Sequence, residues 1–412
     1  MKKKLNTLSL SGLMVGPVLG SGIVVLPSIA FQALGGYAMY AWMIMMLLGA
    51  GFAYVFTRMS MLATTNEGVS QMIGTALGEP FQELSANYLI AAVCFGPIAV
   101  AQTAASYIKG MLPVGTLPSA VIPYAFILVN VLVLLCGVRV MGSVSLILSS
   151  ITAVILTSGG ISSLAIHGLA PLPIGLPDLY MLGSTLLILF WAIIGWEVIG
   201  NYVEDVQNPT RTLPRAMKIS MFAVVLVYFV VTYALQSSPQ AAMNSDVSLN
   251  AIMTPLFHGT APYLLGAVAL ALCYCTILMV LGAITRQMAV RAGDKRLPKF
   301  LAQKPGSRAP VVSILFLTAI HCVIIAFMET GVITVNFVVG IANTFFIGNA
   351  LLGLAGAFIY MKSVWLRALI ALLALGLGML LLFSPTVGWI LFIGVTAGTL
   401  GLAPRMKAKH VA

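Results

Sequence analysis

The sequence predicts an all-α integral membrane protein with twelve transmembrane helices, arranged as a five-plus-five inverted repeat in which helices one and six are broken. Its composition indicates this class, because 60% of the 412 residues are hydrophobic, 8% are charged and the mean hydropathy is +1.06. Soluble domains do not have that balance. Polar breaks divide the chain into twelve apolar stretches of roughly 20 residues, the length that crosses a hydrocarbon core of about 30 Å.

The twelve stretches form two comparable units and a remainder. They cover residues 9–33, 38–57, 86–108, 117–137, 143–166, 180–203, 217–236, 262–285, 310–328, 332–360, 364–383 and 386–403. The first unit of five covers 9–166, the second covers 180–360, and 364–403 adds two helices. Because five crossings is an odd number, the second unit is inverted relative to the first. No polar connection can hold another folded domain, so residues 1–412 are expected to form one transmembrane domain.

The positive charge of the chain is distributed unevenly. With a cytoplasmic N-terminus, all of the 21 lysines and arginines except Lys109 fall on the cytoplasmic side. Inner loops of multi-pass proteins have this bias. The net charge of +11 therefore reports topology and does not indicate nucleic acid as a partner. We expect both termini to be cytoplasmic.

Cysteine and histidine show no metal-binding or disulfide pattern. The five cysteines lie within or at the edges of apolar stretches, where cysteine usually acts as a small hydrophobic residue. The four histidines form no cluster. The chain also contains no His-Glu-x-x-His, no Gly-x-Ser-x-Gly and no intramembrane aspartate pair. We therefore expect no cofactor, no metal and no enzymatic activity.

The first apolar stretch is interrupted at Gly20-Ser21-Gly22. Each glycine weakens a helix by roughly 1 kcal/mol, and unpaired amides inside a membrane are tolerated only where they line a cavity. Freed N–H groups from Gly20 to Ile23, at the start of a half-helix, point the positive end of a dipole toward an anion. A carboxylate is the expected guest of this break.

The sixth stretch has a matching interruption at Gly195-Trp196-Glu197. Glu197 is the only one of ten acidic residues well inside an apolar stretch, where a charge costs at least about 2.5 kcal/mol. Trp191, one helical turn before Gly195, is placed to cover a ligand. Freed carbonyls here and freed amides at the first break together suit a zwitterion. Because the surrounding wall offers no membrane-embedded lysine, arginine or aspartate, an amino acid with a neutral, apolar side chain fits best.

Several of these residues also have a simpler structural explanation. Gly12, Gly16 and Gly20 are spaced four apart and could form a small-residue stripe for close helix packing. Glu197 could be a protonated acid that is hydrogen-bonded to a neighbouring helix, and Trp191 an ordinary buried aromatic residue.

The tenth stretch is unusually polar. Asn336 and Asn343 lie seven residues apart and therefore share one helical face. They could form part of a gate, or they could only make hydrogen bonds between helices.

At both breaks the chain resembles the amino acid, polyamine and organocation transporter superfamily. The resemblance rests on the Gly-Ser-Gly-Ile sequence of the first break and the aromatic-rich Gly-x-Glu sequence of the second. The segment from Glu204 to Ala216 is similar to the superfamily's Glu-x-x-x-Asn-Pro-x-Arg-x-Leu-Pro loop. Arg286, Arg291 and Leu297-Pro298 are similar to its signature at the end of the eighth stretch.

The resemblance implies a five-plus-five inverted repeat that holds its substrate near the midplane. It implies that the Ser21 hydroxyl and the Gly22 amide contact a carboxylate, and that the carbonyls of Val18, Trp191 and Ile194 contact an ammonium group. The candidate substrate-binding residues are Val18, Gly20, Ser21, Gly22, Ile23, Trp191, Ile194 and Gly195. The candidate gating or proton-coupling residues are Trp191, Glu197 and Asn343.

Within the superfamily, the Phe190-Trp191 pair and the short chain look most like bacterial exporters of methionine and branched-chain amino acids. This implies a secondary active transporter, an antiporter or exporter, in the bacterial cytoplasmic (inner) membrane. The implied substrates are methionine, leucine, isoleucine and valine, with efflux favoured over uptake. The expected partners are the neutral amino acid, membrane lipid and protons, in a monomer or homodimer. An uptake permease or exchanger, and a channel or receptor for amino acids, stay open as alternatives.

Departures from the superfamily pattern concern ion coupling. Some proton-coupled relatives have a lysine in the fifth stretch, but residues 142–166 include no ionisable side chain. The eighth stretch has Thr276 and the distant Thr285 in place of the adjacent hydroxyl pair of sodium-coupled relatives, which disfavours sodium. Glu67 stands where relatives often have glycine, and no pattern in the sequence explains it.

Overall fold

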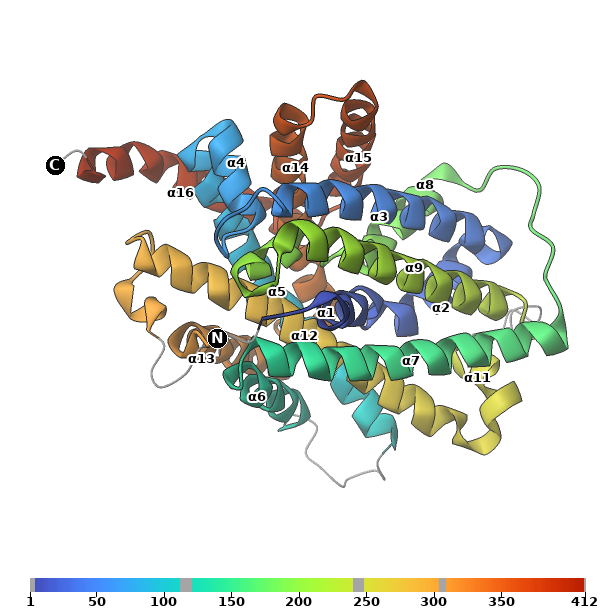
Figure 1. Cartoon of the computed structure of the whole chain (residues 1–412). Coiled ribbons are helices and arrows are strands. Elements are labelled where there is room, and N and C mark those ends of the chain that lie inside the picture. The colour runs from blue at the N-terminus through green and yellow to red at the C-terminus, as the bar shows by residue number, and fades with distance from the viewer. Residues whose placement is uncertain (1–3, 112–120, 240–247, 304–308, 411–412) are drawn as a thin grey trace.

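The computed structural model describes residues 4–111, 121–239, 248–303 and 309–410, with side chains as far as residue 401. These residues form a bundle of helices without named strands (Figure 1). One isolated parallel bridge joins Leu5 to Val206. Lys2 and Lys3, the start of the predicted stretch 117–137, and the side chains of the basic C-terminal residues lie outside the described residues.

The helices follow one another with short connections. In chain order they are α1 (Thr7–Leu19), α2 (Gly22–Leu34), α3 (Ala38–Ser60), α4 (Val69–Leu77), α5 (Glu79–Met111), α6 (Val121–Leu135), α7 (Val138–His167), α8 (Leu179–Leu189), the 3-10 helices η2 (Phe190–Ile193) and η3 (Glu197–Asp205), α9 (Pro209–Gln236), α11 (Asn250–Phe257), α12 (Ala261–Gly293), α13 (Val311–Glu329), α14 (Val335–Tyr360), α15 (Val364–Leu382) and α16 (Thr386–His410).

Helix is present in every apolar stretch that the sequence predicts. Among the described residues, nine helical stretches are long and apolar enough to cross a membrane, and one of them, Thr7–Ser60, contains α1, α2 and α3. The helices at 121–135 and 386–401 are apolar but shorter. The chain is thus an all-helical, multi-pass membrane protein, whereas the number of twelve crossings and the inverted repeat stay predictions.

Two polar connections contain helices that the hydropathy pattern does not indicate. The connection after α3 contains α4, and α5 begins at Glu79 and not near residue 86. The connection between α9 and α12 contains α11. Hydropathy does not indicate the first turns of α5 because they carry the charged residues Glu79 and Glu83. Glu83 pairs with Arg291 and Arg296.

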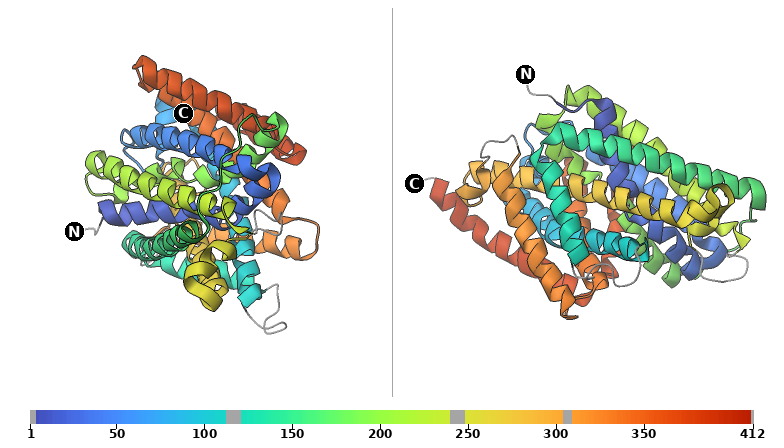
Figure 2. Two further views of the ribbon diagram at one scale, coloured as in Figure 1. Left: turned by 90° about the vertical axis from the view of Figure 1, so that its right-hand side faces the viewer. Right: turned by 90° about the horizontal axis from the view of Figure 1, so that it is seen from below.

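The outer surface of the bundle is apolar. Leu47, Leu132, Val154 and Trp365 are all more than three-fifths exposed, although a soluble protein would bury such side chains. Lipid is the environment in which this surface is stable. In the right-hand view of Figure 2, α16 runs in red along one edge of the bundle toward the C-terminus.

The interior is organised around α1. This helix lies between α7 and α9 and also contacts α12 (Figure 1). A Cβ at Gly12 would collide with the backbone of Leu146, and one at Gly16 would come 2.5 Å from the Cβ of Cys275. Gly12 and Gly16 therefore allow close helix packing, which agrees with the small-residue stripe considered from the sequence. This packing places the end of α1 at the centre of the bundle.

Candidate functional site

The first break separates α1 from α2. Gly20 has φ +46° and ψ −155°, a conformation that favours glycine, and its amide bonds to the Gly16 carbonyl at 2.7 Å. A Cβ at Gly20 would lie 2.5 Å from the Pro17 carbonyl oxygen and 2.9 Å from the Thr276 hydroxyl oxygen. No side chain caps the start of α2 at Ser21, so the first amides of α2 keep free donors.

The second break ends α8 and changes the backbone direction. After η2, Ile194 is extended, with φ −67° and ψ 137°, and Gly195 has φ +122°. The Gly195 amide donates to the Glu197 carboxylate at 3.0 Å. Glu197 is buried, and its carboxylate satisfies a backbone amide of the break that lies two residues before it. The glycine pattern of the sequence located both breaks.

The two breaks contact each other through side chains. The Trp191 indole N–H donates to the Ser21 hydroxyl oxygen at 3.2 Å. A Cβ at Gly195 would lie 3.6 Å from a methyl group of Val18, so the backbone of the second break packs on the end of α1. Segments about 170 positions apart in the chain therefore share one site.

A tyrosine of α9 holds the end of α1. The Tyr228 hydroxyl lies 3.2 Å from the carbonyl oxygens of both Val18 and Leu19, and its ring stacks on Trp42 with a centroid distance of 4.5 Å. The Val18 carbonyl thus already accepts a hydrogen bond, and one lone pair is left for a ligand. Sequence analysis missed Tyr228, because a tyrosine within an apolar helix is unremarkable on its own.

Two cavities lie on either side of Trp191. The smaller has a volume of about 30 Å³, which has room for water but not for an amino-acid side chain. It is lined by Pro17, Gly96, Pro97, Val100, Trp191, Ile194, Thr276, Ile277, Val280 and Phe346. The larger has a volume of about 520 Å³. Its lining residues are Ser21, Gly22, Val25, Leu26, Ile29, Ala99, Thr103, Leu187, Ile188, Trp191, Val335, Asn336, Val339, Gly340 and Asn343.

The larger cavity has a buried floor and an open rim. Ser21 and Gly22 at the floor are buried, whereas Val335 and Asn336 at the start of α14 are exposed. The Asn343 carboxamide oxygen is buried and has no hydrogen-bond partner among the described residues. Asn336 and Asn343 therefore both face a cavity, and Asn343 offers an acceptor to a guest.

The cavities include only part of the predicted site. Ser21, Gly22, Trp191 and Asn343 line the larger cavity, and Trp191 and Ile194 line the smaller one. The remaining candidates, Val18, Gly20, Ile23, Gly195 and Glu197, lie at the breaks but outside both linings. Phe346, Val100 and Val280 contribute to the wall without any signal in the sequence, because apolar residues in apolar helices carry no mark of function.

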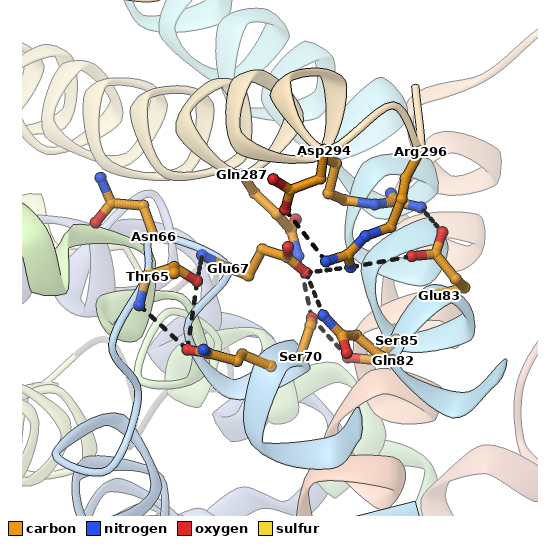
Figure 3. A network of polar contacts seen from close by, with 12 residues as sticks. Thr65, Asn66, Glu67, Ser70, Gln82, Glu83, Ser85, Gln287, Asp294 and Arg296 are labelled. Carbon is orange, nitrogen blue, oxygen red and sulfur yellow. Dashed lines mark hydrogen bonds and ion pairs between the residues drawn. The ribbon is translucent and has the colours of Figure 1, made fainter. Parts of the chain in front are cut away.

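A charged cluster of Glu67, Glu83, Arg291, Arg296 and Asp294 lies on the other side of the breaks. It gathers around the start of α4, the first turns of α5 and the end of α12, next to the end of α14 and therefore away from the rim at the start of α14. Figure 3 shows Arg296 between two carboxylates, 3.1 Å from Glu67 and 3.3 Å from Glu83. Arg291 pairs with the second oxygen of Glu83.

Glu67, which no sequence pattern explains, is a buried member of this charged cluster and pairs with Arg296. Its carboxylate also accepts from the Gln82 amide at 2.7 Å. Burial alone lowers the pKa of Arg296, but the charges of Glu67 and Glu83 outweigh it and raise that pKa above its ordinary value. The guanidinium therefore stays charged, and its ion pairs join the segment before α4 and the segment after α12 to α5.

The end of η3 is tied to α12 by charged and aromatic contacts. Asp205 pairs with Arg286 of α12 at 2.9 Å, and the Arg286 guanidinium lies 4.9 Å from the centre of the Tyr202 ring. The Tyr202 hydroxyl donates to the Met279 carbonyl at 2.6 Å. These contacts explain the Asp205 and Arg286 motifs structurally, because they tie the segment after the second break to α12.

Comparison with known proteins identifies relatives along nearly the whole chain. The sequence profile of a family described as amino acid permease matches residues 5–402. The chain is similar to the uncharacterized amino acid permease YecA of Bacillus subtilis, with 19% identity over 79% of this chain and 78% of that protein. It is 24% identical to the L-methionine/branched-chain amino acid exporter YjeH of Escherichia coli, over 69% of each chain. It is 26% identical to the cadaverine/lysine antiporter of Escherichia coli, over 75% of this chain and 71% of that protein.

Proposed function

Because the chain belongs to the amino acid permease family, we propose that it is a secondary active transporter of neutral, apolar L-amino acids that works by alternating access. Methionine, leucine, isoleucine and valine are the proposed substrates, and export is the proposed direction. The observation that carries the proposal is the absence of a charged side chain from the described linings of both cavities at the breaks.

The chemistry of the cavities distinguishes between the substrates of the two named relatives. A lysine or cadaverine side chain carries an ammonium group, which requires a carboxylate or several acceptors when it is buried. The smaller cavity presents mainly Val100, Ile277, Val280 and Phe346 to a guest. Burial of an apolar side chain against such a wall contributes about 25 cal/mol per Å² of apolar area. The wall thus favours the substrate class in the name of the exporter.

The backbone of the breaks supplies the groups for the rest of an amino acid. In the proposed complex the free amides at Gly22 and Ile23 and the Ser21 hydroxyl bind the carboxylate, at the positive end of α2. The carbonyls of Trp191 and Ile194 bind the ammonium group, together with the remaining lone pair of Val18. This assignment uses the predicted site residues and adds the Asn343 oxygen as a further acceptor.

Trp191 is the proposed gate. It lines both cavities, and the smaller one is too small for a side chain while the ring stays in place. Rotation of the ring away from Ser21 would join the two volumes and admit the substrate side chain. We take this structure as the state in which the larger cavity is accessible from the start of α14 and the charged cluster closes the opposite end. The proposed alternate state opens that end and closes the first.

Counterflow in proteoliposomes tests the proposed function. Vesicles that contain the purified protein and an excess of unlabelled methionine are expected to accumulate labelled methionine or leucine, and not labelled lysine. The rate of net methionine flux is then measured with the gradient of unlabelled methionine imposed in either direction. The direction with the faster flux distinguishes an exporter from an uptake permease, and an exchanger shows no net flux. Saturable binding without counterflow would instead identify a receptor, and conductance without saturation a channel. Accumulation of lysine but not methionine would overturn the proposed substrate class.

A further inference from the structure

Pro97 leaves one carbonyl of α5 without its helical partner. Proline has no backbone N–H, so a proline inside a helix cannot donate to the carbonyl four residues earlier. Pro97 lies in the middle of α5, and the carbonyl that it leaves is that of Val93. Both residues are within a long apolar helix, where an unpaired carbonyl costs free energy.

His321 of α13 lies against this carbonyl. Its Nε2 atom is 2.8 Å from the Val93 oxygen, and the side chain is fully buried. Because a carbonyl only accepts, Nε2 carries the proton. The other ring nitrogen, Nδ1, is buried and has no partner among the described residues. The Nε2–H group and the Val93 carbonyl therefore satisfy each other's hydrogen-bonding needs, although the two residues are 228 positions apart in the chain.

The segment of α5 around Pro97, where a proline inside a helix produces a bend, forms a wall of the smaller cavity. Gly96 and Pro97 both line it, opposite Trp191. A Cβ at Gly96 would lie 3.7 Å from the ring of Phe346 and 3.9 Å from that of Trp191, so the backbone of α5 itself faces the gate. A small change in the bend moves this wall relative to the indole.

We propose that His321 is a positioning residue of the substrate site. Its Nε2–H replaces the helical hydrogen bond that Pro97 removes, and this fixes the bend of α5 that sets the width of the cavity beside Trp191. The role in transport rests on the proposed function, because the cavity is taken to hold the substrate side chain. The replacement of the missing helical hydrogen bond by His321 does not depend on that function.

A double-mutant cycle tests the proposal. His321→Phe keeps a ring but leaves the Val93 carbonyl unpaired, whereas His321→Gln keeps a donor near the place of Nε2. Pro97→Ala restores a backbone N–H that can bond to Val93 without His321. We compare the effect of His321→Phe in the parent and in the Pro97→Ala background, so any effect of Pro97→Ala alone cancels.

Two readouts are measured on each full-length variant. In proteoliposomes, His321→Phe is expected to raise the KM for methionine about fivefold or more in the parent background and less than about twofold beside Pro97→Ala, with His321→Gln near the parent. In detergent without substrate, amide hydrogen exchange in residues 93–101 is expected to accelerate several-fold in His321→Phe, and not in the double variant. A merely structural role would lower the melting temperature equally in both backgrounds and leave KM unchanged.

The outcomes separate this inference from the proposed function. Equal effects of His321→Phe on exchange in both backgrounds would overturn the inference, whether or not the protein transports methionine. If the parent transports no neutral amino acid but the exchange rates depend on Pro97 as expected, the proposed function fails and the positioning of α5 by His321 stands. If amide hydrogen exchange behaves as expected while the KM for methionine is unchanged, His321 fixes the bend of α5 but does not set the width of the substrate cavity. Its proposed role in transport is then wrong.

Discussion

The indole N–H of Trp191 donates to the hydroxyl of Ser21 at 3.2 Å, so the residue proposed as gate is held by the residue proposed to bind the carboxylate. The Ser21 oxygen accepts from the indole through a lone pair and still has its own proton to donate to a substrate carboxylate, so both contacts meet at one atom. This contact links the occupancy of the first break with the position of the ring, which is the coupling that a gated binding site requires.

Ser21→Ala removes the hydroxyl from both roles. Loss of a hydrogen bond to a charged group costs about 1.5–3 kcal/mol, which corresponds to a roughly 10- to 100-fold weaker affinity for methionine. The stabilisation of the purified protein by methionine in a thermal-shift titration measures this affinity. Ser184→Ala, at a partly exposed serine of α8 whose hydroxyl donates to the Met181 carbonyl of its own helix, is the matched control. An unchanged dissociation constant for Ser21→Ala would remove Ser21 from the binding site.

Gly22→Val is expected to abolish transport in correctly folded protein. A Cβ at Gly22 would lie 3.0 Å from the Tyr228 hydroxyl oxygen and 3.2 Å from Leu26, and the branched side chain would project toward the cavity that Gly22 lines. Overpacking of this kind costs about 1–3 kcal/mol, so we expect methionine counterflow to fall at least about tenfold. Gly378→Val in α15 is the control, because no atom lies within 4 Å of a Cβ there. Wild-type flux with Gly22→Val would contradict the proposed site.

Glu67→Gln is expected to destabilise the charged end of the bundle. The variant keeps the side-chain length but removes one of the three carboxylates that pair with Arg296. Since Arg296 is partly exposed, we expect a loss of about 2 kcal/mol, less than for a fully buried pair. The double variant Glu67→Gln with Arg296→Gln is expected to regain part of this loss. Asp294→Asn, at the more exposed partner, should change stability by less than about 0.5 kcal/mol.

Thermal melting in detergent measures each member of this cycle. Additive losses from Glu67→Gln and Arg296→Gln would show that the two side chains do not stabilise each other, in spite of the 3.1 Å between them.

The sequence predicts the features of this protein that depend on local chemistry. Gly20 and Gly195 mark the breaks because their backbone conformations favour glycine, and hydropathy locates the helices because lipid requires long apolar segments. The partners of Glu67 and His321 are not predictable in this way. Glu67 and Arg296 are 229 positions apart, and no local pattern indicates which distant side chain will complete a buried polar group. The cavity wall is hidden for a related reason, since its apolar residues look like the rest of their helices.

Glu197→Gln separates a proton-coupling role of Glu197 from a purely structural one. The Gly195 amide donates to the Glu197 carboxylate at 3.0 Å, and a glutamine oxygen at the same place can accept the same bond. The variant therefore keeps the hydrogen bond that holds the second break, but its side chain can neither gain nor lose a proton. If protonation of Glu197 accompanies transport, the rate of methionine exchange in the variant loses the pH dependence that the parent shows, while methionine still binds. Glu197→Ala is the control for the bond itself and is expected to lower the melting temperature, because the Gly195 amide loses its acceptor. Identical pH profiles of the parent and Glu197→Gln would assign Glu197 to the structure of the break alone.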